Sequence, residues 1–272
     1  MFQPLKKMFS AKDASRRAAM PDGQRAYVIG DIHGRNDLLI KLVAAIEADD
    51  AALRQIALEP VDTSVILLGD LIDRGPDSAG VIATARALDE RMTLRCLMGN
   101  HEEMFLDAFE DTGVLRHFLK HGGRETILSY GISRKDFNAC DLKELQALIH
   151  ERVPADHLDY LRGFEDMITL GDYLFVHAGI DPLKPLDEQS TRELRWIRES
   201  FLSHKERHSH IVVHGHTITE DVDERKNRIG IDTGAYRHGR LTALVLEGDT
   251  RRYIQAVEGK AGGIDIFTKG GK

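Results

Sequence analysis

The chain has 272 residues, of which 42% are hydrophobic and 30% charged, and its formal net charge is −7. This balance is typical of a globular protein with a sizeable core and gives no sign of a basic nucleic-acid-binding surface. There is no run of 18 apolar residues, so neither a transmembrane helix nor a membrane partner is expected. Cys96 and Cys140 belong to no paired motif, which favours reduced thiols and a cytoplasmic protein.

Short β-rich runs alternate with helical patterns in the first third of the chain. Apolar residues recur at helical spacing over 37–53 and 78–92, and the alternation of strand and helix predicts a layered α/β core. The closing strand-like runs follow one another without long helices, which predicts a second, more antiparallel sheet. The predicted strands cover residues 25–30, 64–69, 94–99, 173–179, 210–215, 229–234, 241–248 and 251–257.

The region between His101 and His177 has mostly helical patterns, and we expect a helical cap insert at 102–170. Residues 102–176 carry eight Lys and Arg against fifteen Asp and Glu, a net charge of −7. Such acidity belongs either to solvated helix faces or to a cap that disfavours a long polyanion. The expected division is an N-terminal extension at 1–24, a main domain at 25–258 and a C-terminal tail at 259–272.

Five strand ends deliver Asp, His and Asn side chains, in the motifs GDIHG, GDLIDRG, GNHE, VHAG and HGHT. Open α/β sheets bind ligands at these ends, and such donors suit Mn²⁺, Fe or Zn²⁺. Each motif alone is more often a structural turn, but five in this order favour a pair of metals. Asp70 is the best candidate to bridge two ions. The proposed ligands are Asp31, His33 and Asp70 for the first ion, and Asp70, Asn100, His177 and His216 for the second.

The motifs GDIHG, GDLIDRG and GNHE, followed by the histidines of VHAG and GHT, resemble those of the calcineurin-like metallophosphoesterases. The arginine in GDLIDRG is similar to the phosphoprotein phosphatase branch, and the symmetrical dinucleoside tetraphosphatases share most of these motifs. The resemblance runs from about residue 25 to 247. It implies a four-layer α/β-β-α metallophosphatase sandwich with an α-helical insert. It also implies two divalent cations, with Mn²⁺ expected and Fe or Zn²⁺ as alternatives.

The resemblance also implies catalytic roles. His101 would be the general acid that protonates the leaving oxygen, with Asp73 holding its imidazole. Arg74 would bind the phosphate, since a guanidinium matches its oxygens. Arg198, two residues after a tryptophan, would be the second phosphate-binding arginine, and an exposed helical arginine is the alternative. The expected substrate-contacting residues are Arg74, Arg198, Asn100 and Tyr236.

The chain departs from the related GHxH pattern at its last position. There, Ile218 stands where many metallophosphoesterases have a histidine that reaches the first metal. The phosphoprotein phosphatase branch also lacks this histidine, so the absence favours that branch. His214 precedes the expected ligand His216 by two residues, and we expect it to have a supporting or structural role.

The favoured function is metal-dependent hydrolysis of phosphate esters by in-line attack of an activated water. No phosphoenzyme is expected, because no Cys or Ser lies in a nucleophile motif. The expected substrate is a serine/threonine phosphoprotein or a small phosphomonoester. One alternative is a symmetrical bis(5'-nucleosyl)-tetraphosphatase, and another is a catalytically inactive binding module. The intact set of proposed ligands disfavours the inactive module.

Overall fold

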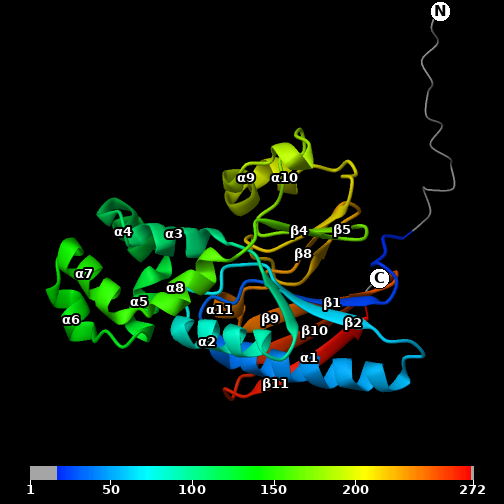
Figure 1. Ribbon diagram of the computed structural model, residues 1–272, viewed down its shortest axis with the longest axis horizontal. Helices are drawn as coiled ribbons and strands as arrows, with labels where there is room; N and C mark the ends of the chain where they lie inside the picture. Colours follow the sequence, from blue (N-terminus) through cyan, green and yellow to red (C-terminus); the bar gives the residue numbers. More distant parts are fainter. Residues whose placement is uncertain (1–16, 271–272) are drawn as a thin grey trace, which may run out of the picture.

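The computed structural model describes residues 17–270, so the predicted extension at 1–24 lies outside the description up to residue 16. Two β-sheets pack face to face, and helices cover the outer face of each, as the side-on view shows (Figure 1). The predicted four-layer α/β-β-α arrangement is therefore confirmed.

The first sheet has six strands in the order β11-β10-β9-β1-β2-β3. The pairs β1–β2 and β2–β3 are parallel, so the loops after these three strands leave the same edge of the sheet. The pairs β1–β9, β9–β10 and β10–β11 are antiparallel. The strands are β1 (Gln24–Ile29), β2 (Asp62–Leu67), β3 (Thr93–Cys96), β9 (Arg240–Glu247), β10 (Thr250–Glu258) and β11 (Ile264–Gly270).

The second sheet has five strands in the order β4-β5-β6-β8-β7. They are β4 (Met167–Leu170), β5 (Tyr173–Val176), β6 (Ile211–His214), β7 (Asp223–Glu224) and β8 (Arg228–Gly230). The prediction that the closing strands form a separate, mainly antiparallel sheet is wrong. The strands β5, β6 and β8 are parallel to one another, whereas β9 and β10 extend the first sheet. β9 pairs with the free edge of β1, a partner about 215 residues away that local sequence does not reveal.

Apolar residues alternate along the strands and so fill two separate spaces. On β1, Ala26 and Val28 face the second sheet, whereas Tyr27 and Ile29 pack among the helices of the outer layer. The helices α1 (Asn36–Ile56) and α2 (Ser78–Asp89) form that layer and lie below the first sheet in Figure 1. Their buried residues recur at helical spacing, as the sequence predicts. On the opposite side, α9 (Thr191–Trp196) and α10 (Glu199–Leu202) cover the second sheet.

The insert between β3 and β4 is a cluster of short helices at one end of the two sheets (Figure 1). It is less continuous than its apolar pattern implies, because a π turn at Leu119–Gly123 interrupts it and Gly122 has a φ of +106°. The last residues of the predicted cap at 102–170 form β4, which belongs to the second sheet. The helices are α3 (Asn100–Ala108), α4 (Thr112–Phe118), α5 (Arg124–Ser129), α6 (Arg134–Ala139), α7 (Leu142–Arg152) and α8 (Ala155–Arg162).

The main domain extends beyond its predicted limits of 25 and 258 at both ends of the described chain. The Met20 side chain is buried between the sheets, and its N–H donates to Gly248 O. Residues 264–270, expected in a tail, instead form β11 and pair along β10. The backbone hydrogen bonds of an exposed sheet edge explain this addition. No helix in residues 17–270 is long and apolar enough to cross a membrane. Cys96 and Cys140 are both free thiols.

Candidate active site

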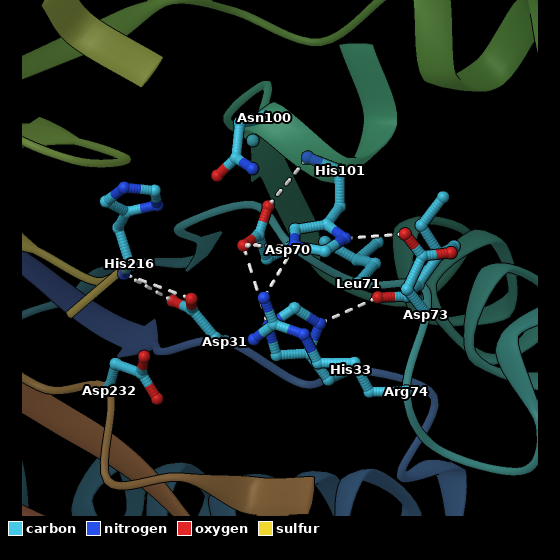
Figure 2. A network of polar contacts seen from close by, with 12 residues as sticks. Asp31, His33, Asp70, Leu71, Asp73, Arg74, Asn100, His101, His216 and Asp232 are labelled. Atoms are coloured by element: carbon cyan, nitrogen blue, oxygen red, sulfur yellow. Dashed lines mark hydrogen bonds and ion pairs between the residues drawn. The ribbon is translucent and has the colours of Figure 1, made fainter. Parts of the chain in front are cut away.

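The proposed ligands converge at the carboxyl ends of strands from both sheets. Figure 2 shows Asp31, Asp70, Asn100 and His216 directed toward a common space, although they follow four different strands. All are more than nine-tenths buried. The close approach of the loops after β2 and β3 depends on Gly99, since a Cβ there would lie 2.3 Å from Asp70 Oδ1. The sequence therefore concentrates these polar side chains in one water-poor place.

Backbone strain is concentrated in the same place. In the described part of the chain, the non-glycine residues with positive φ are His33, Asp70, Asp73, Arg74 and His216. Each such conformation costs on the order of 1–3 kcal/mol and persists only where the surroundings enforce it. All five residues were selected from the sequence motifs as site residues. Their shared conformation indicates a backbone folded to aim side chains rather than to minimise local energy.

Two groups of three side chains have donor atoms close enough to hold an ion. The first group is His33, Asp70 and His101, and the second is Asp70, His177 and His216. The ligand atoms within each group lie within 4.8 Å of one another. Asp70 belongs to both groups, which is the position that a bridging carboxylate requires. Asn100 joins the second group, because its Oδ1 lies 3.1 Å from His177 Nε2.

The donor atoms of the second group face one another in a way that fits a cation. His177 Nδ1 donates to Leu68 O at 2.8 Å, so its Nε2 carries a lone pair in the neutral ring. Burial lowers the pKa of His177, which keeps the ring neutral. Its Nε2 lies 3.4 Å from Asp70 Oδ1 and 3.2 Å from His216 Nδ1. The lone pairs of His177 Nε2 and Asp70 Oδ1 therefore point to one place, and a divalent ion satisfies such an arrangement.

The other imidazoles are also prepared as neutral ligands. His33 Nδ1 donates to Ile72 O at 2.8 Å, which fixes the ring and leaves Nε2 free of a proton. Burial holds the pKa of His33 well below its ordinary value. Burial and then the neighbouring His177 lower the pKa of His216 to about 2. The buried His216 Nε2, on the side of the ring away from His177, has no hydrogen-bond partner among the described residues.

Asp31 lies beside these groups but belongs to neither of them. Both of its carboxylate oxygens accept the His216 N–H, at 3.0 and 3.1 Å. Burial, followed by the negative charges of Asp232 and Asp70, raises its pKa well above the ordinary value. A cation at this position would offset that repulsion. The assignment of Asp31 to the first ion therefore remains a prediction that the electrostatics favour.

Glu102, the last residue of GNHE, has a role that our sequence analysis missed. Its carboxylate is fully buried and accepts the N–H groups of Asp70, Leu71 and Gly99 at 2.8, 2.8 and 3.1 Å. One side chain thus ties the loops after β2 and β3 together and holds Asp70 in its strained conformation. Burial, followed by the charge of Asp70, raises the pKa of Glu102 to about 7.

The proposed acid His101 is held by a buried relay. Its Nδ1 lies 2.5 Å from Asp73 Oδ2, while the Thr126 hydroxyl donates to Asp73 Oδ1 at 2.6 Å. Burial alone would lower the pKa of His101, but the charges of Asp70 and Asp73 outweigh it and the pKa lies above its ordinary value. A raised pKa favours the protonated form of the imidazole, which a general acid needs. Thr126, in α5 of the cap, was not selected from the sequence.

We expect Thr126→Val to lower kcat by ~10–100-fold, the range for loss of a partner that orients a reactive histidine. The variant removes the hydrogen bond to Asp73 without changing the size of the side chain much. The expected signature is a downward shift of the apparent pKa of the acid group in the kcat–pH profile. Thr126→Ser keeps the hydroxyl and serves as the control. Equal kcat and equal pH profiles for the Val and Ser variants would contradict this role.

Arg74 lies between the two ring nitrogens that face the centre of the site. Its guanidinium is 2.9 Å from His33 Nε2 and 2.9 Å from His101 Nε2. It also stacks 4.8 Å from the centroid of the Tyr236 ring, which packs edge-on against His33. The backbone of Arg74 donates to the carbonyl of Gly122 in the cap at 3.0 Å. Figure 2 shows this guanidinium in the middle of the site, next to His33 and below Asp70.

Arg198 and His214 lie at the margin of the site. Arg198 immediately precedes α10 and is exposed, and its guanidinium makes no hydrogen bond or ion pair with another residue in the range 17–270. Its charge nevertheless lowers the pKa of both His177 and His216, which places it near the second group. His214 bonds instead to Gly215 O at 3.1 Å, and its Nε2 lies 3.4 Å from Arg228. These contacts agree with the supporting or structural role expected for His214.

Comparison with known proteins agrees with this geometry. Residues 24–243 match the family described as calcineurin-like phosphoesterase. Serine/threonine-protein phosphatase 2 of Escherichia coli is 29% identical over 222 residues, covering 79% of this chain and 90% of that protein. Serine/threonine-protein phosphatase 1 of Salmonella typhimurium is 36% identical, but the match covers 37% of this chain and 40% of that protein. The symmetrical bis(5'-nucleosyl)-tetraphosphatase of Baumannia cicadellinicola is 34% identical, covering 35% and 28%.

Solved structures share the fold at lower identity. The crystal structure of a putative diadenosine tetraphosphatase superimposes with a TM-score of 0.58 at 20% identity, covering 94% of this chain and all of that one. A cold-active protein tyrosine phosphatase gives 0.56 at 20% identity, covering 92% and 81%. With the family match spanning most of the chain and the convergent donors at its strand ends, the protein belongs to the calcineurin-like phosphoesterase family and is a metal-dependent phosphatase.

Proposed function

We propose that this enzyme is a protein serine/threonine phosphatase that also accepts small phosphomonoesters. The observation that carries the proposal is the pairing of the Arg74 guanidinium with the two ring nitrogens at the centre of the site. A single guanidinium at that point suits one terminal phosphoryl group, with two oxygens held in a bidentate way. The relatives support this choice, because the phosphatase of Escherichia coli matches along 90% of its length.

The surroundings of Arg198 also favour a peptide over a polyphosphate. A cavity of about 940 Å³ is lined by residues on either side of Arg198, among them Trp196 and Ile197. In the described chain, its lining includes the carboxylates of Glu103, Asp181 and Glu193 but one cation, Arg192. A chain of further phosphates would want additional cations along its path, whereas a neutral or basic peptide would not.

The charge of the cap disfavours a polyphosphate less strongly than the sequence suggested. Its net charge is −7 over residues 102–176, but the segment that contacts Arg74 is the π turn Leu119–Gly123, which carries Lys120 and His121. The cap is thus acidic as a whole and basic where it meets the site. The choice of substrate therefore rests on the site and the neighbouring cavity rather than on the field of the whole insert.

Within the proposed reaction, each side chain has a chemical task. Two divalent ions, Mn²⁺ by our proposal, would polarise the attacking water and offset charge on the phosphoryl group when bound. Asp31, His33 and Asp70 would hold one ion, and Asp70, Asn100, His177 and His216 the other.

Arg74 and Arg198 would bind phosphate oxygens, and Tyr236 would keep Arg74 in place by stacking. His101 would give the proton on Nε2 to the leaving oxygen while its Nδ1–H stays hydrogen-bonded to Asp73. Free Cys96 and Cys140 favour a reducing, cytoplasmic location.

The proposed substrate class is tested by comparing kcat/KM for a phosphoserine peptide and diadenosine tetraphosphate, with Mn²⁺ present. We expect the higher value for the phosphopeptide, because Arg74 and Arg198 can hold one phosphoryl group and the cavity beside Arg198 is lined by mostly acidic charged groups. An aryl phosphate provides the generic reference for turnover. A tenfold or greater preference for the dinucleotide would replace the proposal with a dinucleoside tetraphosphatase. Absence of turnover on all three substrates would favour a binding module.

The same assay includes Arg198→Ala. We expect this change to weaken transition-state binding, measured through kcat/KM, by ~1.5–3 kcal/mol, the range for hydrogen bonds to a charged group. That is a loss of roughly tenfold to 150-fold. The control is Arg207→Ala, which removes the same charge from an exposed residue after α10. Equal values for the two variants would assign Arg198 to the solvated surface.

A further inference from the structure

The strongest unassigned feature of the molecule is a buried carboxylate, Asp232, in the turn that follows β8. It is 2% exposed and lies next to Asp31 in the site, as Figure 2 shows. The two come together because β1 and β8 approach closely at Gly30. A Cβ on that glycine would lie 2.5 Å from the carbonyl oxygen of Ile231. Two acidic side chains from different sheets therefore share one small space.

The two carboxylate oxygens of Asp232 have different surroundings. Its Oδ1 accepts the N–H of Gly234 at 3.0 Å and so closes the turn. Its Oδ2 is buried and receives no hydrogen bond from a donor in residues 17–270, and the acidic side chain of Asp31 lies against this carboxylate. A buried, unpartnered carboxylate oxygen is costly and rare, and it calls for a ligand. Asp232 thus stabilises the turn through Oδ1, and its Oδ2 is available to bind a ligand.

No protein cation neutralises this pair. Within the described chain, neither Asp31 nor Asp232 takes part in an ion pair with Lys, Arg or His. Asp70, a third buried carboxylate, adds to their negative charge. Arg74, the nearest arginine in Figure 2, is hydrogen-bonded to His33 and His101 instead. A cation from outside the chain would offset the charge of these buried carboxylates.

The position of Ile218 gives a reason for a carboxylate here. Ile218 stands where a GHxH sequence would place a histidine for the first metal, and its side chain lies over the turn that follows Asp232. A Cβ on Gly234 would be 3.1 Å from the Cγ2 of Ile218. The Thr219 N–H, next to Ile218, donates to the Asp232 carbonyl at 3.0 Å, so the segment that lacks the histidine lies against the turn that holds Asp232.

We propose that Asp232 Oδ2 is a further oxygen ligand of the first metal ion and supplies the donor that Ile218 lacks. This inference rests on the proposed two-metal centre. It gives the first ion a ligand set of three carboxylates, Asp31, Asp70 and Asp232, and the His33 imidazole. Such an oxygen-rich set favours a hard ion such as Mn²⁺ over Zn²⁺.

The test is Mn²⁺ binding to Asp232→Asn by isothermal titration calorimetry, with no substrate present. Asparagine keeps the Oδ1 that accepts the Gly234 N–H, so the turn retains its cap while the negative charge is lost. We expect one of the two ions to bind ~10–100-fold more weakly and the other to bind as in the unaltered protein. Asp249→Asn removes the same charge from the exposed β9–β10 turn and is the control. Asp232→Ser, whose hydroxyl also can cap the turn, is the second variant.

A second measurement separates a metal ligand from a structural residue. Without metal, Asp232→Asn is expected to raise Tm, because it removes one of several buried like charges. With Mn²⁺, the gain in Tm is expected to be smaller than for the unaltered protein. Unchanged affinity for both ions in the Asn and Ser variants would overturn the inference about Asp232 and leave the metal centre intact. Failure of the unaltered protein to bind Mn²⁺ would overturn both.

Discussion

Asp70→Asn is expected to abolish most metal binding and to lower turnover by about 10³-fold or more. Asp70 is the residue shared by the two candidate groups, so its loss affects both ions. Its oxygens lie 3.6 Å from His33 Nε2 and 3.4 Å from His177 Nε2, one toward each group. Metal ions contribute several kcal/mol of charge stabilisation in the transition state, and each 1.4 kcal/mol is a tenfold change in rate.

The measurement is elemental analysis of the purified variant alongside its kcat for an aryl phosphate. Asp62→Asn is the matched control, because it changes an exposed aspartate at the opposite end of the same strand, β2. Circular dichroism checks that the fold persists. Two metals per chain together with normal turnover in Asp70→Asn would refute the bridging role.

His101→Ala is expected to lower kcat by ~10²–10⁴-fold while both metals stay bound. The reason is the loss of the proton donor, whose raised pKa depends on Asp70 and on the 2.5 Å contact with Asp73. The loss is expected to shrink as the pKa of the leaving group falls, since a good leaving group needs little protonation. Measuring kcat over a series of aryl phosphates with different leaving groups tests this dependence.

The same variant also decides between two roles for His101. Its Nε2 lies 3.9 Å from Asp70 Oδ2, so the geometry alone also permits a ligand of the first ion. Loss of one metal from His101→Ala would assign it that role. An equal loss of kcat for every leaving group would count against general acid catalysis.

The local sequence predicts most of the first sheet and its helices because each element carries its own periodicity. The strands β1, β2 and β3 and the helices α1 and α2 fall within a few residues of their predicted ranges. The sequence fails where a partner is distant or the pattern is short. β4 and β7 have four and two residues, too few for a period to be recognised. β11 is mostly exposed and is held by its pairing with β10 rather than by an apolar face.

The candidate site likewise contains residues that the local sequence identifies and residues that it does not. Short motifs that combine Asp, His, Asn and Gly after apolar strands identify His33, Asp70 and His177, because the residue types and the strand ends are both local information. Glu102 was within a quoted motif but had no recognisable task until its backbone donors were seen. Thr126 carries no local signal and lies 53 residues from Asp73. Asp232 ends the predicted strand at 229–234, as the other acidic candidates end theirs, but its neighbour Asp31 is 201 residues away.

The sequence by itself determined the reaction chemistry of this protein, because metal-ligating side chains at strand ends form a pattern that one stretch of chain can encode. Only the tertiary structure decided which of these side chains lie close together and what holds them. Packing of the two sheets brings Asp232 to Asp31, and the cap brings Thr126 to Asp73 and Gly122 to Arg74. These contacts depend on how distant segments exclude water together, and no local periodicity records that.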